Sequence, residues 1–229
     1  MNELDRSEAK AGYPLPRLNE AAPDFEAFTT HGPKRLEDWC GRWLLFFSHP
    51  GDFTPVCTTE FVELARRHDE FQALGCDLLG LSVDSRWSHI AWLRWIEERL
   101  DVAIPFPVIE DVGLEIARRY GMIQPGESAT ATVRTVFAID PDGIVRAMSW
   151  YPMAVGRSVD ELLRMMRALV TTHDRKVATP EGWQPGQDTM LMAPETLDEA
   201  LRRREDRPEA EDWFLCLTGD ADETKESVR

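Results

Sequence analysis

The sequence predicts an α/β fold, in which a mixed sheet is flanked by helices and followed by a C-terminal extension. Two observations predict this class. Short apolar runs typical of buried strands alternate with segments of helical periodicity. A turn then joins two further apolar runs, which predicts an antiparallel hairpin at the end of the alternation.

Each element has its own local signal. The turn Asp140-Pro141-Asp142-Gly143 predicts the hairpin, because proline fixes one φ angle and glycine tolerates a positive one. Gly75 and Gly121 are stop signals for the helices before them. Ser158 and Glu161 form a capping box that opens a helix. The expected elements are strands at 43–47, 78–83, 133–139 and 144–150, and helices at 60–74, 85–100, 111–120 and 158–169.

The chain is expected to form one domain over 14–174 and an arm over 175–229. After Thr172 the pattern becomes irregular and rich in turn residues. A mostly charged stretch at 195–207 predicts an exposed helix, and a short apolar run at 212–216 precedes an acidic tail. Because the arm has few apolar residues, we expect it to dock on another surface.

The charge balance excludes several classes of partner. The 229 residues include 26 Lys and Arg against 41 Asp and Glu, a formal net charge of −15. Such an acidic chain is not expected to bind nucleic acid or an anionic membrane through its overall charge. We find no secretory signal and no apolar run near the ~20 residues of a membrane span. These features predict a cytoplasmic protein.

Four cysteines are present, at positions 40, 57, 76 and 216, and no Cys-x-x-Cys occurs. The five histidines form no pair with a cysteine at the spacing of a metal site. We therefore predict neither a metal nor an organic cofactor. In a reducing compartment, any disulfide would be transient or catalytic.

Cys57 has the most informative surroundings. A buried strand ends near Phe47, and Thr54-Pro55 then gives a strong helix-start signal, with threonine as N-cap and proline at the first helical position. Cys57 is then the third helical residue. Its sulfur would lie in the first turn, where free N–H groups and the positive end of the helix dipole favour a thiolate. A random buried cysteine is usually inert, but this context favours a reactive one.

The residues around Cys57 resemble the active-site signature of the peroxiredoxins, Pro50-x-x-x-Thr54-x-x-Cys57. The longer string from Ser48 to Glu60 is similar to the one-Cys subfamily and to archaeal-type thioredoxin peroxidases. The resemblance extends over about 14–220. Further similar segments are 88–92, 104–107, 133–137, 151–157 and 160–161.

The resemblance implies a thioredoxin-like fold and a thiol peroxidase that reduces hydroperoxides and needs no cofactor. It implies that Cys57 is the attacking thiolate, that Thr54 binds the peroxide, and that Arg134 holds the thiolate and substrate oxygens. It also implies that Pro50 shields the site and that His49 and Arg157 border the substrate pocket. The implied partners are thioredoxin or a small thiol as reductant, and a second copy in a homodimer or a decameric ring of dimers.

Arg134 is also notable without the resemblance. It shares one face of the expected strand with Val136 and Ala138, so a cation lies beside apolar neighbours and should have an anionic partner. A lowered thiol pKa would by itself raise the rate of attack on peroxide only slightly. Lowering it from about 8.5 to about 6 raises the thiolate population about thirtyfold at pH 7. The accompanying loss of nucleophilicity lowers the rate of attack about tenfold, so the net gain is small. Groups that stabilise the transition state must supply the rest, and Thr54 and Arg134 are the candidates.

Cys216 is the candidate that would resolve the oxidised form of Cys57. Its segment resembles the one that carries a resolving cysteine in archaeal-type relatives, although an earlier cysteine of that segment is replaced here by Ala210. The alternative is that Cys216 only belongs to the apolar patch of the arm. Cys40 and Cys76 lie beside expected strands, and we assign both to packing.

Two other functions remain open at this point. The first is a chaperone-like holdase in which Cys57 is only a redox switch; a peroxide-consumption assay distinguishes it from a peroxidase. The second is a lipase-like hydrolase, since some one-Cys relatives carry a serine nucleophile before the first buried strand. Arg42 occupies that position here, and no Gly-x-Ser-x-Gly occurs, which disfavours a hydrolase.

Overall fold

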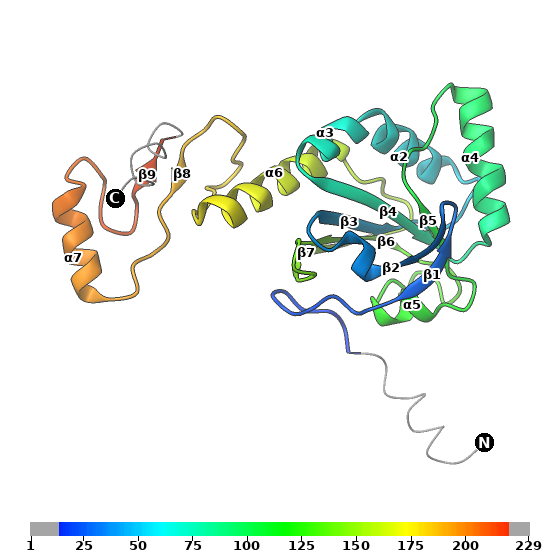
Figure 1. The fold of residues 1–229 in the computed structure, drawn as a ribbon, viewed down its shortest axis with the longest axis horizontal. Helices are drawn as coiled ribbons and strands as arrows, with labels where there is room; N and C mark the ends of the chain where they lie inside the picture. The colour runs from blue at the N-terminus through cyan, green and yellow to red at the C-terminus, as the bar shows by residue number, and fades with distance from the viewer. Residues whose placement is uncertain (1–13, 220–229) are drawn as a thin grey trace, which may run out of the picture. The chain divides into compact units, whose positions relative to one another are not determined.

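A computed structural model describes residues 14–219 of the chain (Figure 1). The chain divides after Val159 into two compact units. The first contains a seven-stranded mixed sheet in the order β2-β1-β5-β4-β3-β6-β7, in which β3, β4 and β5 are parallel and the other pairs antiparallel. Its strands are β1 (Glu26–Thr29), β2 (Gly32–Arg35), β3 (Trp43–Ser48), β4 (Cys76–Ser82), β5 (Val108–Glu110), β6 (Arg134–Ile139) and β7 (Val145–Tyr151).

The helices of the first unit differ from the sequence expectation in two places. The helix expected over 60–74 begins earlier and is broken at Arg67, whose φ and ψ of −100° and 9° end the first part. The helix expected over 111–120 begins later, because the Asp111 carboxylate accepts the N–H groups of Glu115, Ile116 and Ala117 and so caps it. The helices of this unit are η1 (Leu36–Trp39), α2 (Pro55–Arg66), α3 (His68–Ala73), α4 (Arg86–Leu100) and α5 (Glu115–Arg119).

Both faces of the sheet are covered, which is why every residue of β3 is buried. Alternate side chains of β3 point to opposite faces. On one face the Phe47 ring packs against Phe61 of α2, with ring centroids 5.7 Å apart. On the other, Phe46 packs edge-on against Tyr120, just after α5, at 5.0 Å. The mixed sheet flanked by helices is thus confirmed.

The strand order brings the end of β3 and the start of β6 together. The two strands are antiparallel neighbours, with Phe47 paired to Val136, so Arg134 lies at the edge of the sheet where β3 ends. The chain leaves β3 there, makes a short loop and enters α2. The predicted hairpin is confirmed as well, because β6 and β7 pair across the turn that contains Gly143, whose φ is 77°.

The second unit holds most of α6 (Val159–Arg175), a two-stranded sheet of β8 (Thr189–Met190) and β9 (Leu217–Thr218), and α7 (Leu197–Asp206). Helix α6 runs past the expected end at 169. Helix α7 corresponds to the exposed helix expected over 195–207. Trp213, Phe214 and Leu215 are partly or largely exposed. Among the helices of residues 14–219, none is long and apolar enough to cross a bilayer.

Candidate active site

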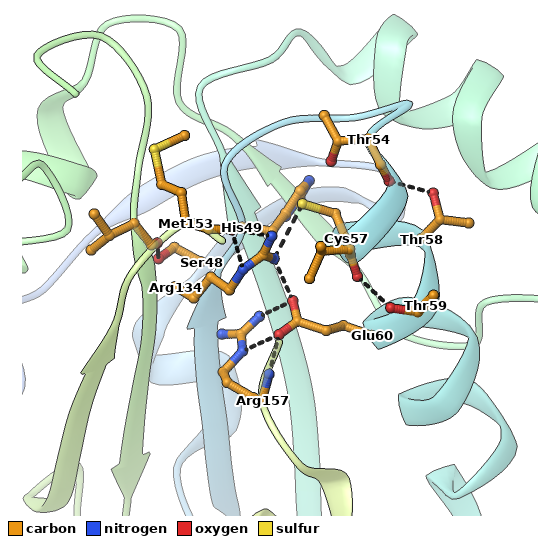
Figure 2. A network of polar contacts seen from close by, with 12 residues as sticks. Ser48, His49, Thr54, Cys57, Thr58, Thr59, Glu60, Arg134, Met153 and Arg157 are labelled. Carbon is orange, nitrogen blue, oxygen red and sulfur yellow. Dashed lines mark hydrogen bonds and ion pairs between the residues drawn. The ribbon is translucent and has the colours of Figure 1, made fainter. Parts of the chain in front are cut away.

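Cys57 lies in the first turn of α2, at the position expected from Thr54-Pro55. Thr54 has extended backbone angles and Pro55 is the first helical residue. The Cys57 side chain is completely buried, on the side of the helix that faces the sheet edge (Figure 2). Burial alone disfavours a charged sulfur, so a thiolate here needs donors or a cation within reach.

Thr54 occupies the N-cap position, but its hydroxyl does not cap the helix. It donates instead to the carbonyl of Gly51 at 2.7 Å, within the same loop. The expected capping bond is therefore wrong. Because that hydroxyl proton is engaged, the oxygen of Thr54 presents its lone pairs as an acceptor. The first-turn N–H groups of α2, which have no partners within the helix, are not covered by this side chain.

Arg134 supplies the cation. Its Nη1 donates to the Cys57 sulfur at 3.3 Å and to Glu60 Oε2 at 2.7 Å (Figure 2). Its Nε and Nη2 both donate to the carbonyl of Met153, at 3.0 and 2.7 Å. A guanidinium carries five N–H donors, and these contacts use four of them. Among the described residues, one Nη2 proton has no acceptor.

Glu60 is the anionic partner of Arg134, which the sequence led us to expect but did not identify. It lies three residues after Cys57, and therefore on the same side of α2. Burial by itself would raise the pKa of Glu60, but the guanidinium groups of Arg157 and Arg134 hold it below the ordinary 4.5. A single glutamate on an otherwise apolar helix face was the signal that could have revealed it.

Arg157 forms hydrogen bonds with Glu60 and not with Cys57. Its backbone N–H and Nε donate to Glu60 Oε1 at 2.7 and 2.9 Å, and its Nη2 donates to Oε2 at 2.8 Å. Its Nη1 donates to the carbonyl of Thr135 at 2.7 Å. The guanidinium also stacks over the Phe47 ring, 5.2 Å from its centroid. In this arrangement Arg157 fixes Glu60, which in turn fixes Arg134.

His49 and Pro50 begin the loop between β3 and α2. Pro50 is half-buried. The His49 ring is fully buried and contacts Phe61, one helical turn after Cys57, with ring centroids 4.7 Å apart. Since residues four apart share a helix face, His49 lies on the side of α2 that carries Cys57.

The other cysteines differ from Cys57 in their surroundings. Cys76 is buried, and desolvation raises the pKa of its thiol far above the ordinary value, as suits a packing residue. Cys40 is exposed, so the packing role expected for it is wrong. Cys216 is buried in the second unit, with its sulfur 3.3 Å from the carbonyl of Asp212. All four thiols are free.

Comparisons with known proteins identify the family of the chain. Residues 18–148 match the AhpC/TSA family, and residues 168–207 match the C-terminal domain of 1-Cys peroxiredoxin. Peroxiredoxin 2 of Thermoplasma acidophilum is 50% identical over 198 residues, which cover 86% of this chain and 98% of that protein. A peroxiredoxin of Aquifex aeolicus is 46% identical over 213 residues, covering 88% and 96%.

Solved structures give the same result. A cysteine-to-serine mutant of peroxiredoxin 6 from Arenicola marina aligns with a TM-score of 0.78 at 34% identity, covering 89% of this chain and 97% of that one. The yeast mitochondrial 1-Cys peroxiredoxin aligns with a TM-score of 0.80 at 34% identity, covering 90% and 100%. The thioredoxin-like fold expected from the sequence is therefore confirmed. The chain belongs to the peroxiredoxin family of thiol-dependent peroxidases.

Proposed function

We propose that this protein reduces hydrogen peroxide and organic hydroperoxides, with the Cys57 thiolate as nucleophile. The observation that carries the proposal is the Arg134 guanidinium 3.3 Å from a buried sulfur at a helix N-terminus. The thiolate attacks the terminal oxygen of ROOH, an S–O bond forms and the O–O bond breaks. The alkoxide that leaves takes a proton from water, so Cys57 becomes a sulfenic acid and the substrate becomes ROH.

The polar groups around Cys57 match a hydroperoxide. Such a molecule offers one or two O–H donors and two oxygens that accept. The remaining Nη2 proton of Arg134 and the first-turn N–H groups of α2 supply donors for the oxygen on which charge develops. The Thr54 oxygen and the unpartnered Nδ1 of His49 supply acceptors for the O–H. Pro50 limits the access of water, and Arg157 acts through Glu60.

The cycle closes when a thiol reduces the sulfenic acid. We propose a thioredoxin-type protein or a small thiol as the final reductant. The yeast mitochondrial 1-Cys peroxiredoxin is resolved via glutathione/thioredoxin systems. In this chain Cys216 is the candidate for first attack on Cys57. The expected assembly is a homodimer or a decameric ring of dimers.

Replacement of the nucleophile tests the proposal. Cys57→Ser should abolish peroxide consumption with a thiol reductant, because a serine hydroxyl is un-ionised at neutral pH and oxygen is the poorer nucleophile. Cys40→Ser, at an exposed cysteine outside the site, is the matched control and should keep full activity. More than a trace of activity in Cys57→Ser would overturn the assignment.

The same variants distinguish a chaperone-like holdase. A holdase would prevent aggregation of a heat-denatured client protein without consuming peroxide, and it would do so equally well with serine at position 57. Turnover of peroxide by the wild type, lost in Cys57→Ser, identifies the peroxidase activity as a property of this site.

A further inference from the structure

A second buried polar cluster adjoins the Cys57 site, and the proposed peroxide reduction gives no task to two of its three members. It consists of His49, Asp52 and His89. Each of the three side chains is at most 1% exposed. The cluster contains one unusual atom: Nδ1 of His49 is buried and has no hydrogen-bond partner among the described residues. A buried polar atom without a partner costs about 1–3 kcal/mol, so its retention calls for a functional reason.

The partners of His89 fix its protonation. Its Nε2 lies 3.1 Å from the carbonyl of Ile109, and a carbonyl only accepts, so this nitrogen carries a proton. Its Nδ1 lies 2.9 and 3.0 Å from the two carboxylate oxygens of Asp52. Hydrogen bonds from His49 and His89 hold the pKa of Asp52 far below its ordinary value against the opposing effect of burial. Asp52 is therefore a carboxylate, and His89 is an imidazolium with both nitrogens protonated.

The same carboxylate fixes the tautomer of His49. Nε2 of His49 lies 3.0 Å from Asp52 Oδ1, which accepts and does not donate, so the proton of His49 is on Nε2. Burial lowers the pKa of His49 below its ordinary value, which keeps the ring neutral. The Asp52 charge is already balanced by His89. Nδ1 of His49 is consequently left as an unprotonated acceptor, in a ring that packs on Phe61 one helical turn after Cys57.

We propose that Asp52 and His89 are positioning residues for peroxide reduction, which together lock His49 in the neutral Nε2–H tautomer so that its Nδ1 accepts a hydrogen bond from the O–H of the hydroperoxide. This inference rests on the proposed function. It assigns a task to two residues that contact neither the sulfur nor the substrate. The ring itself is held in place by Phe61 and by Trp92, which stacks on it at 5.3 Å.

A metal ion is a less suitable occupant of this cluster. The ligand atoms of His49, Asp52 and His89 lie within 4.8 Å of one another, which is close enough for coordination. However, Nδ1 of His89 and Nε2 of His49 both carry protons that already bond to Asp52. A cation would have to displace both protons and enter a site with almost no solvent access. The hydrogen-bonded triad satisfies these atoms without one.

Asp52→Leu provides a specific test. Leucine is close to aspartate in size but has no hydrogen-bonding atom, so Nε2 of His49 loses the acceptor that fixes the tautomer. Asp111→Asn is the matched control, because Asp111 is also a buried carboxylate but accepts only backbone N–H groups at the start of α5. His89→Gln is a second variant, which leaves Asp52 with no cation and should drive His49 toward its protonated form.

The first measurement uses the reduced protein without peroxide. Ring-nitrogen NMR of the ¹⁵N-histidine-labelled chain, with the His49→Gln and His89→Gln variants used for assignment, reports which nitrogens carry protons. In the wild type we expect a bare Nδ1 on His49 and two protonated nitrogens on His89. In Asp52→Leu we expect the His49 proton to be no longer confined to Nε2. Protonation of His49 at Nδ1 in the wild type would contradict the proposed Nε2–H tautomer.

The second measurement is the rate of sulfenic acid formation under conditions where Cys57 is fully ionised in every variant. Asp52→Leu and His89→Gln should slow it about tenfold, equivalent to one lost hydrogen bond, and Asp111→Asn should not. A shifted tautomer with an unchanged rate would overturn the positioning role. Activity retained in Cys57→Ser would refute the proposed function instead, and the NMR result would still stand.

Discussion

At the scale of single residues, the Arg134 side chain bonds to three different groups of the site. It binds the Cys57 sulfur, the Glu60 carboxylate and the Met153 carbonyl at once. The planar fork of a guanidinium permits this, because its donors point in fixed and different directions. A lysine has the same charge but only a compact ammonium group. Charge and geometry can therefore be separated experimentally at this position.

We expect Arg134→Ala to reduce both the thiolate population of Cys57 at neutral pH and the rate of attack on peroxide. Arg134→Lys should keep much of the thiolate but lose most of the rate, about tenfold or more, because one ammonium cannot replace the oriented donors. The rates should be measured by rapid mixing with peroxide at a pH above the thiol titration of each variant. Wild-type rates under those conditions would show that Arg134 affects ionisation only.

At the scale of the elements, one carboxylate holds three segments together. Glu60 belongs to α2, Arg134 begins β6, and Arg157 lies in the loop that follows β7. All three side chains are nearly fully buried, at 2–4% exposure. Removal of any one of the three groups should lower the stability of the fold, because the remaining charges stay buried without a full set of partners.

We therefore expect Glu60→Gln to destabilise the protein by about 3–5 kcal/mol. The measurement is urea unfolding at neutral pH. Glu98→Gln is the matched control, because Glu98 forms an exposed pair with Arg94 on α4 and should change stability by less than about 0.5 kcal/mol. Equal stabilities of the two variants would contradict the structural role assigned to Glu60.

The pH dependence of this effect has a definite sign. The pKa of Glu60 in the folded protein is below the ordinary 4.5. Its contribution to stability is therefore present above pH 4.5 and is lost as the pH falls through the folded value. The difference in unfolding free energy between wild type and Glu60→Gln should shrink in acid. A constant difference from pH 7 downward would show that Glu60 is not the group that titrates.

At the scale of the whole molecule, the two cysteines proposed to react with each other belong to different compact units. Cys57 lies in the first and Cys216 in the second, and both are buried. A disulfide requires Cα atoms within ~7 Å, and attack requires exposed sulfurs. Resolution by Cys216 would therefore follow local opening around both residues.

Wild type treated with one equivalent of peroxide should contain a Cys57–Cys216 disulfide, within one chain or between two copies, detectable by peptide mapping. Cys216→Ser should instead accumulate sulfenic acid and reach the sulfinic state at lower peroxide doses. Cys40→Ser should behave as wild type. If Cys216→Ser turns over normally with thioredoxin or small thiols and no such peptide forms, the enzyme uses one cysteine.

The sequence by itself determined the fold class and the place of the reactive cysteine, because both depend on local signals. Apolar runs of strand length, the Thr54-Pro55 helix start and the 140–143 turn act over a few residues, and all three elements form as expected. The spacing from Pro50 to Cys57 was also sufficient to indicate the family. Arg134 could be singled out for the same reason, since a cation on an apolar strand face is visible in the sequence.

Only the tertiary structure decided which charges meet. Glu60 and Arg157 are 97 residues apart, and Asp52 and His89 are 37 apart, so no local pattern pairs them. The pairing arises because β3 lies between β4 and β6, which brings the ends of distant segments to one edge of the sheet. The hydroxyl of Thr54 is a smaller example. Its residue type predicted a helix cap, but the nearby Gly51 carbonyl takes its proton, so the folded loop assigns the oxygen a different role.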